Sequence, residues 1–189
     1  MRWRLLTARC HHSSYPPADD AGHSDLEDSS ASNTQVLVAR STDGGSTFSP
    51  PVRVHRDDWE INGCSHAGPA LAVDDDGAVH VAWYTAAHGG VGLYRAVSTD
   101  RGLTFHGTQV VEPDVPKGLA RLVSAGGTVW LAWESPIEKE VHLGAIGDLP
   151  NAQTFPGTLP ALSAAGSVLS LAWELDEKVD AYVLRQMTA

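Results

Sequence analysis

Short apolar runs with β-type alternation recur along this chain and are separated by glycine-containing turns. Three of them, at residues 79–83, 129–133 and 168–173, end in the same Ala-Trp pair. Each follows a turn that contains Gly, and another short apolar run precedes the turn, at 69–73, 120–124 and 160–163. Because strand side chains alternate between two faces and Gly suits tight hairpin turns, this pattern predicts three antiparallel hairpins.

A third run follows each hairpin, at 92–97, 140–146 and 180–184, and residues 36–40 resemble it in a unit that lacks its beginning. The three Trp residues lie 50 and 40 positions apart. Repeats of roughly this length with four strands each are typical of β-propeller blades. We therefore expect an all-β fold of four-stranded antiparallel blades, with units at about 34–55, 66–112, 118–157 and 158–189.

The segments after two of these third runs are the most informative in the chain. Residues 41–48 and 98–105 match at six of eight positions and lie 57 residues apart, and a fainter copy at 146–155 keeps the closing Thr-Phe. The Asp of each copy can accept backbone N–H groups in a turn, and the Gly allows a backbone conformation that a Cβ would hinder. We expect Thr to start the outer strand and Phe to fill the gap between the third and fourth strands. These structural positions are Ser41, Asp43, Gly45, Thr47, Phe48, Ser98, Asp100, Gly102, Thr104 and Phe105. A catalytic role for Asp43 or Asp100 is the alternative, but their recurrence in each repeat favours the structural role.

The pattern Ser-x-Asp-x-Gly-x-Thr-Phe resembles the Asp box, or BNR repeat, of the sialidase superfamily, and the likeness extends over residues 34–189. The chain looks most like bacterial exo-α-sialidase-like proteins. The resemblance implies a six-bladed β-propeller and a glycoside hydrolase that acts on glycans. A non-catalytic propeller that binds glycans or protein is the main alternative, and a photosystem-assembly or sortilin-like propeller is a third.

The number of repeats falls short of a six-bladed ring, because the chain holds about three and a half units. An open arc would expose sheet edges and faces. We therefore expect either a fragment or copies that associate to close the propeller.

Sialidases, by the resemblance, use several arginines, a Tyr nucleophile with a Glu partner, and an Asp acid/base. No Arg here lies in the family's Arg-Ile-Pro context, so that set is not transferred residue by residue. Candidates come instead from the loops opposite the Asp boxes, between strands two and three and between blades. A guanidinium pairs well with a carboxylate, and a phenol activated by a carboxylate is a better nucleophile. The catalytic candidates are Tyr84, Glu134, Asp58, Glu60 and Arg121, and the binding candidates are Trp59, Asn62, His66 and His88.

Three of the loop features have a second interpretation. Trp59 could stack on a sugar ring or cap the interface between blades. His66 with Cys64 invites a metal, but two ligands do not make a site, and a packed imidazole is favoured. The acidic run at 74–77 resembles the start of a calcium loop but lacks the later ligands, so we expect a plain turn. No metal and no cofactor are expected.

Composition narrows the classes of molecule that this chain is expected to bind. The formal net charge of −10 argues against nucleic acid and anionic membranes, which both require clustered Lys and Arg. No apolar run reaches the length of a transmembrane helix. The resemblance suggests secretion or a periplasmic location, yet the basic start is followed by too short an apolar stretch for a signal peptide. Residues 1–33 are acidic and rich in Ser, and we expect them to be disordered or non-native.

Overall fold

The computed structural model describes residues 2–7, 33–56, 59–60, 68–87, 89–114, 118–176 and 178–185. Within them the regular structure consists of β-strands and one short 3-10 helix, and no helix has the length and apolar character needed to cross a membrane. The elements are β1 Arg2–Thr7, β2 Asn33–Thr34, β3 Val36–Ser41, β4 Val52–Arg53, β5 Trp59–Glu60, β6 Ala70–Val73, β7 Val79–Thr85, β8 Gly92–Ser98, β9 His106–Pro113, β10 Ala120–Ala125, β11 Thr128–Ser135, β12 Glu140–Ala145, η1 Leu149–Asn151, β13 Gln153–Pro156, β14 Thr158–Ala165, β15 Val168–Leu175 and β16 Lys178–Arg185.

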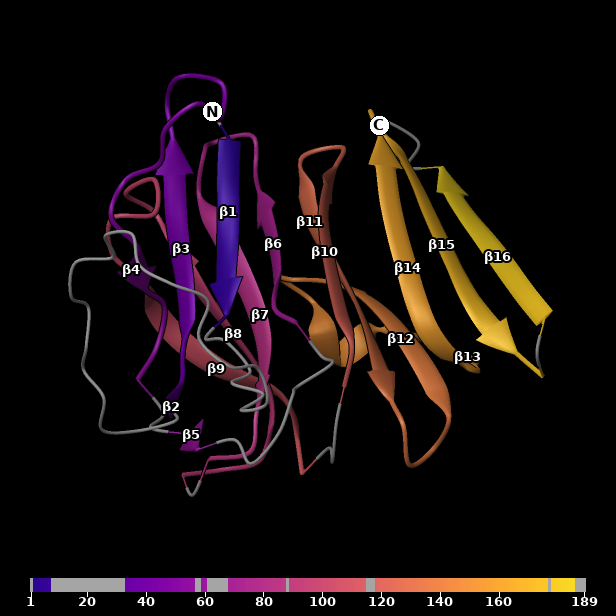
Figure 1. The fold of residues 1–189 in the computed structure, drawn as a ribbon. Coiled ribbons are helices and arrows are strands. Elements are labelled where there is room, and N and C mark those ends of the chain that lie inside the picture. The colour runs from indigo at the N-terminus through magenta and orange to yellow at the C-terminus, as the bar shows by residue number, and fades with distance from the viewer. Residues whose placement is uncertain are drawn as a thin grey trace, which may run out of the picture.

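Four antiparallel sheets stand side by side (Figure 1). Their strand orders are β1-β3-β4, β6-β7-β8-β9, β10-β11-β12-β13 and β14-β15-β16, and β2 pairs with β5 outside them. We call the four the first to fourth sheets. In the second to fourth sheets, consecutive strands are neighbours in the sheet. The inner strand β10 contacts the inner strands β6 and β14 of the two adjacent sheets. The described residues thus form an open arc of propeller-type sheets, which confirms the expected all-β, incomplete propeller fold.

The core lies between neighbouring sheets. One apolar cluster joins the first and second sheets, a second joins the second and third, and a third joins the third and fourth. The repeated Trp residues mark these clusters, because Trp83, Trp133 and Trp173 are only 2%, 6% and 8% exposed. Each buries its indole against the preceding sheet, as its repeated position in the sequence predicts.

Strand β1 departs from the expectation that residues 1–33 are disordered or non-native. It pairs antiparallel with β3 over its whole length, with Arg2 opposite Ser41 and Thr7 opposite Val36. In the first sheet it therefore occupies the place that β7 holds in the second. For these six residues the expectation is wrong, because it rested on the composition of the whole segment. The ladder with β3 supplies the hydrogen bonds that this short basic run cannot make alone.

The outer strands also begin later than the sequence suggests. Strands β4 and β9 start at Val52 and His106, so Thr47 and Thr104 lie in the turns rather than in strands. Phe105 packs on the cluster between the first and second sheets, whereas Phe48 is exposed and lies 5.3 Å below the guanidinium carbon of Arg4. The expectation that both rings fill a gap inside their sheet therefore fails for Phe48.

Candidate functional site

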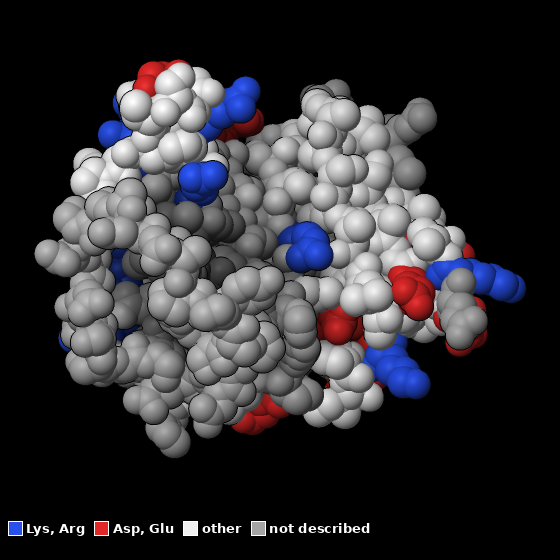
Figure 2. All heavy atoms as spheres, in the orientation of Figure 1, with Lys and Arg blue, Asp and Glu red and all other residues white. Residues whose placement is uncertain are grey.

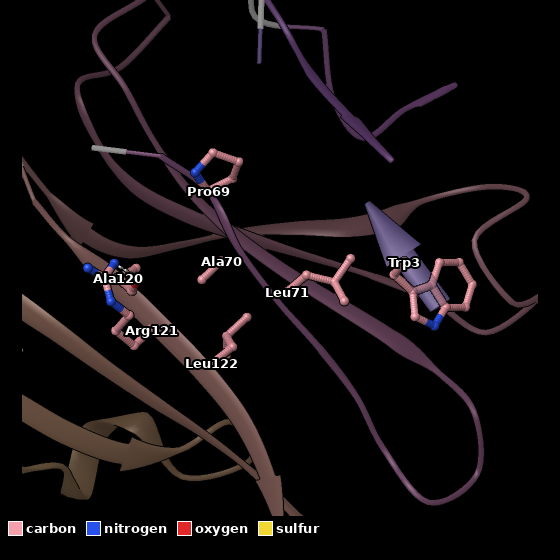
Figure 3. A pocket seen from close by; sticks show the side chains of 7 residues that line it. All are labelled: Trp3, Pro69, Ala70, Leu71, Ala120, Arg121 and Leu122. Carbon is pink, nitrogen blue, oxygen red and sulfur yellow. Dashed lines mark hydrogen bonds between the residues drawn. The ribbon is translucent and has the colours of Figure 1, made fainter. Parts of the chain in front are cut away.

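A pocket of about 340 Å³ lies where the inner strands β6 and β10 run side by side (Figure 3). It is placed between adjacent sheets, so its walls come from two different repeats. Trp3 of β1 lines it as well, far in sequence from the other residues. The lining consists of Trp3, Pro69, Ala70, Leu71, Ala120, Arg121 and Leu122.

Arg121 is the one charged side chain of this lining. Its Nη1 donates to the carbonyl oxygen of Ala120 at 2.9 Å, and its other N–H groups have no hydrogen-bond partner among the described residues. In Figure 3 the guanidinium lies near Ala120, at the opposite end of the lining from Trp3. The remaining walls are small or apolar. A guanidinium with free N–H groups in such a setting suits a carboxylate or another anion.

The face shown in Figure 2 carries its charged side chains in small, separate groups on the described part of the surface. No broad patch of one sign is seen there. Attraction of an anion to the pocket therefore depends on the local guanidinium of Arg121 rather than on an extended basic surface.

Tyr84 and Trp59, two of the predicted site residues, are brought together. Tyr84 lies near the end of β7 and Trp59 lies in β5, and their ring centroids are 5.5 Å apart with planes at 84°. Burial raises the pKa of the Tyr84 phenol. This edge-to-face pair packs the link between the first and second sheets against the second sheet.

Glu134 is engaged in a structural contact. Its carboxylate accepts a hydrogen bond from the backbone N–H of Leu159 at 2.8 Å, which fixes the start of β14 on the end of β11. Leu159 has a positive φ of 55°, so this contact holds a backbone conformation that few side chains adopt. No hydrogen bond or ion pair links Glu134 to Arg121 in the described residues.

The other candidates are placed only in part or not at all. Glu60 pairs through its backbone with Asn33. Asp58, Asn62, His66 and His88 lie outside the described residues, as does Cys64.

The Asp-box segments form hydrogen-bonded turns at the opposite ends of the strands from Tyr84 and Glu134. Asp100 Oδ1 accepts from the backbone N–H groups of Leu103 and Thr104, at 3.0 and 2.9 Å, and from Ser98 Oγ at 2.7 Å. Asp43 accepts from Thr47 and Ser41 in the same manner. These carboxylates are occupied by their own turns.

The acidic turn at 74–77 is likewise closed by its own residues. The Oδ1 of Asp74 accepts from the backbone N–H of Ala78 at 2.8 Å, and its Oδ2 lies 3.1 Å from Nε2 of His80. Both oxygens of the first carboxylate of the calcium-like run are therefore used within the hairpin.

Sequence reasoning missed two groups of residues. Trp3 enters the pocket from the segment that was expected not to fold, although its Trp-Arg-Leu-Leu-Thr run has strand-forming residues. Glu112, Glu138 and His142 each offer one ligand atom, and these atoms lie within 4.8 Å of one another. No spacing motif announces this group, because its members come from two sheets.

Comparisons with known proteins place the fold. No protein-family model matches the sequence, and no curated protein matches it either. The solved structure of the Hadza microbial sialidase Hz136 is 21% identical, covers 82% of this chain and superposes with a TM-score of 0.55. A protein of unknown function from Dyadobacter fermentans is 15% identical over 80% of the chain, with a TM-score of 0.50. The sialidase NanB from Streptococcus pneumoniae, as its K499G mutant, is 14% identical over 76% of the chain and has a TM-score of 0.45.

The match extends over only part of these larger proteins. The chain spans 39% of the Hadza sialidase, 45% of the Dyadobacter protein and 24% of NanB. Structural similarity at such low sequence identity shows the fold and not the activity. Together with the sheet order and the inter-sheet core, the superposition on the Hadza sialidase shows that this chain has a sialidase-like β-propeller fold.

Proposed function

We propose that this chain is part of a sialidase-like propeller that binds acidic glycans, with a sugar carboxylate held by Arg121 in the β6–β10 pocket. The observation that carries the proposal is the guanidinium of Arg121, which has free N–H groups and lines a hollow between two inner strands. A charged donor fork beside small and apolar side chains gives both affinity and orientation to a carboxylate.

The size and walls of the pocket are consistent with this ligand class. A volume of about 340 Å³ is at the lower end of small-molecule sites and accommodates a single sugar unit better than a long oligosaccharide. Leu71 and Leu122 add apolar side chains to the lining, and Trp3, at its other end from the guanidinium, supplies an indole for contact with the C–H face of a ring. We infer recognition of a terminal acidic sugar.

Two features support binding over hydrolysis for the described residues. A Tyr nucleophile requires a lowered phenol pKa, whereas burial raises that of Tyr84. The carboxylate of Glu134 holds the backbone N–H of Leu159. Glycoside hydrolysis by a longer sialidase-like ring remains the alternative, and its motive is the fold shared with the Hadza sialidase.

The test is a binding titration of the purified full chain with 3′-sialyllactose and with lactose, followed by calorimetry or saturation-transfer NMR. We expect binding of the sialylated sugar only. Arg121→Met should weaken it by about tenfold or more, because charge-assisted hydrogen bonds are lost while the apolar stem is kept. Arg53→Met is the matched control: it removes the same charge from β4, where the Nε of Arg53 donates to Gln35 at 2.9 Å, outside the pocket.

Equal affinity for both sugars, or an unchanged affinity in Arg121→Met, would overturn the proposal. A fluorogenic sialoside should be assayed with the same preparations. Turnover that disappears in Tyr84→Phe would replace binding by the hydrolase alternative.

A further inference from the structure

We propose that Glu112, Glu138 and His142 bind a divalent transition-metal ion of the zinc class at the junction of the second and third sheets. Glu112 lies on β9 of the second sheet, Glu138 in the turn between β11 and β12, and His142 on β12 of the third sheet. One carboxylate oxygen or imidazole nitrogen from each lies within 4.8 Å of the other two. This inference is independent of the glycan pocket, whose lining shares no residue with the group.

Each of the three side chains has a polar contact with a neutral neighbour. Trp133 Nε1 donates to Oε2 of Glu112, and Ser135 Oγ donates to Oε2 of Glu138. Nδ1 of His142 lies 3.1 Å from Oγ1 of Thr154. Outer partners of this kind orient metal ligands, and an Nδ1–H bond would leave Nε2 with its lone pair free.

The remaining polar atoms of the group have no hydrogen-bond partner among the described residues. Nε2 of His142 is buried and makes no hydrogen bond. Within the described part of the chain, no Lys or Arg lies within ion-pair distance of Glu112 or Glu138, although two carboxylates meet here. A buried nitrogen without a partner costs free energy, and two carboxylates close together repel one another, so a divalent cation would satisfy all three side chains at once.

The ring of His142 is already oriented for such a role. It stacks on Trp133 with centroids 5.0 Å apart and planes at 22°, and the same indole anchors Glu112. The core residue Trp133 thus positions two of the three ligands. Glu138 is exposed in its turn, so small rotations of its side chain can close the group around an ion.

The ligand set selects the metal class. Zinc takes imidazole nitrogen and carboxylate oxygen at about 2.0–2.2 Å, which places tetrahedral ligand atoms roughly 3.4 Å apart. Calcium and magnesium prefer sites made wholly of oxygen and more ligands than these three side chains provide. A bound ion would join β9 to β12 and so hold two neighbouring sheets together.

The test uses the full chain with His11→Ser and His12→Ser, which removes the adjacent imidazoles near the N-terminus as competing ligands. Calorimetric titration with zinc chloride should show one equivalent bound, and zinc should raise the thermal unfolding midpoint. Glu138→Gln should weaken zinc binding by about tenfold or more and should not lower the metal-free midpoint, because it removes one of two neighbouring negative charges. Glu140→Gln, in the same hairpin but outside the group, should bind zinc like the parent.

A second ligand variant, His142→Gln, should also lose zinc binding. Because His142 lies on β12, this variant tests whether the loss in Glu138→Gln arises only from a change in the turn. Calcium chloride in place of zinc should give neither heat nor stabilisation. The proposal is overturned if the parent binds no zinc, if both ligand variants bind it as tightly as the parent, or if calcium binds instead.

Discussion

At the scale of single residues, the Asp-box carboxylates show how a short polar side chain organises a turn. Bonds from Thr104, Ser98 and Leu103 surround Asp100 and hold the pKa of its carboxyl well below its usual range, with the Thr104 hydroxyl as the largest cause. The pKa of the Asp43 carboxyl is lowered in the same way, chiefly by the hydrogen bond from the Thr47 hydroxyl. Asp43 is exposed and Asp100 is partly buried, and burial acts to raise both pKa values, so the lowering comes from the hydrogen bonds.

This lowered pKa leads to a pH-dependent prediction for Asp100→Asn. A depressed folded-state pKa contributes stability above the unfolded pKa of about 3.9, and the contribution is lost as the pH falls from there towards the folded value. The variant should be less stable than the parent at pH 7, and the gap should narrow below about pH 4. Thermal unfolding of parent and variant at several pH values measures this stability difference. Asp76→Asn, an exposed turn carboxylate, is the control, and a gap that stays constant with pH would contradict the prediction.

At the scale of elements, β1 is the least expected strand. Its Trp3 lies over the second Asp-box turn, where a Cβ added to Gly102 would come within 2.6 Å of the indole. The side chain of Arg40 on β3 reaches the same turn and donates to the carbonyl of Arg101 at 3.2 Å. Strand β1 therefore joins the first sheet to the second through close packing on a glycine.

Two glycines with nearly equal backbone angles isolate this contact. Gly102 has φ +77° and faces Trp3, whereas Gly44 has φ +78° and nothing within 4 Å. Alanine at either should cost about 1–2 kcal/mol for the left-handed conformation, and Gly102→Ala should cost more because of the clash. Denaturant unfolding measures both. In a Trp3→Ala background the excess should vanish. Equal costs in the parent would mean that β1 does not pack as described.

The hairpins and most strand positions could be predicted from sequence, because alternation and Gly turns act within a few residues. The partner of β1 could not, since pairing with β3 joins positions 29 to 39 residues apart, from Thr7 with Val36 to Arg2 with Ser41. The residues of the candidate site also divide into those that the sequence indicates and those that only the structure reveals. Tyr84 and Arg121 are candidates because of their places in the repeat, but the contact of Glu134 with Leu159 and the group around His142 depend on which sheets meet.

At the scale of the whole molecule, each sheet is stabilised by packing against its neighbouring sheets. Leu171, 1% exposed, belongs to the cluster between the third and fourth sheets, and Val81, fully buried, belongs to the one between the first and second. Among the described residues, each core cluster joins two neighbouring sheets and none spans all four. Such an arrangement resembles a repeat array, in which each interface contributes separately.

Leu171→Ala should therefore act locally. We expect a loss of about 2–5 kcal/mol at its interface and faster amide hydrogen exchange in β14–β16 and β10–β13, with β6–β9 protected as in the parent. Val81→Ala is the mirror experiment and should loosen the first two sheets while sparing β14–β16. Exchange measured by mass spectrometry separates the two cases. Uniform deprotection by either variant would show a single cooperative unit instead.

The amino-acid sequence alone determined the all-β repeat, its hairpins and the position of the Asp-box turns, because these depend on alternation and turn chemistry between near neighbours. Only the tertiary structure decided that β1 completes the first sheet, that Arg121 and Trp3 line one pocket, and that Glu112 meets Glu138 and His142. Each of these depends on how sheets from distant segments pack. That packing is governed by the shape and burial of whole faces, which no local pattern encodes.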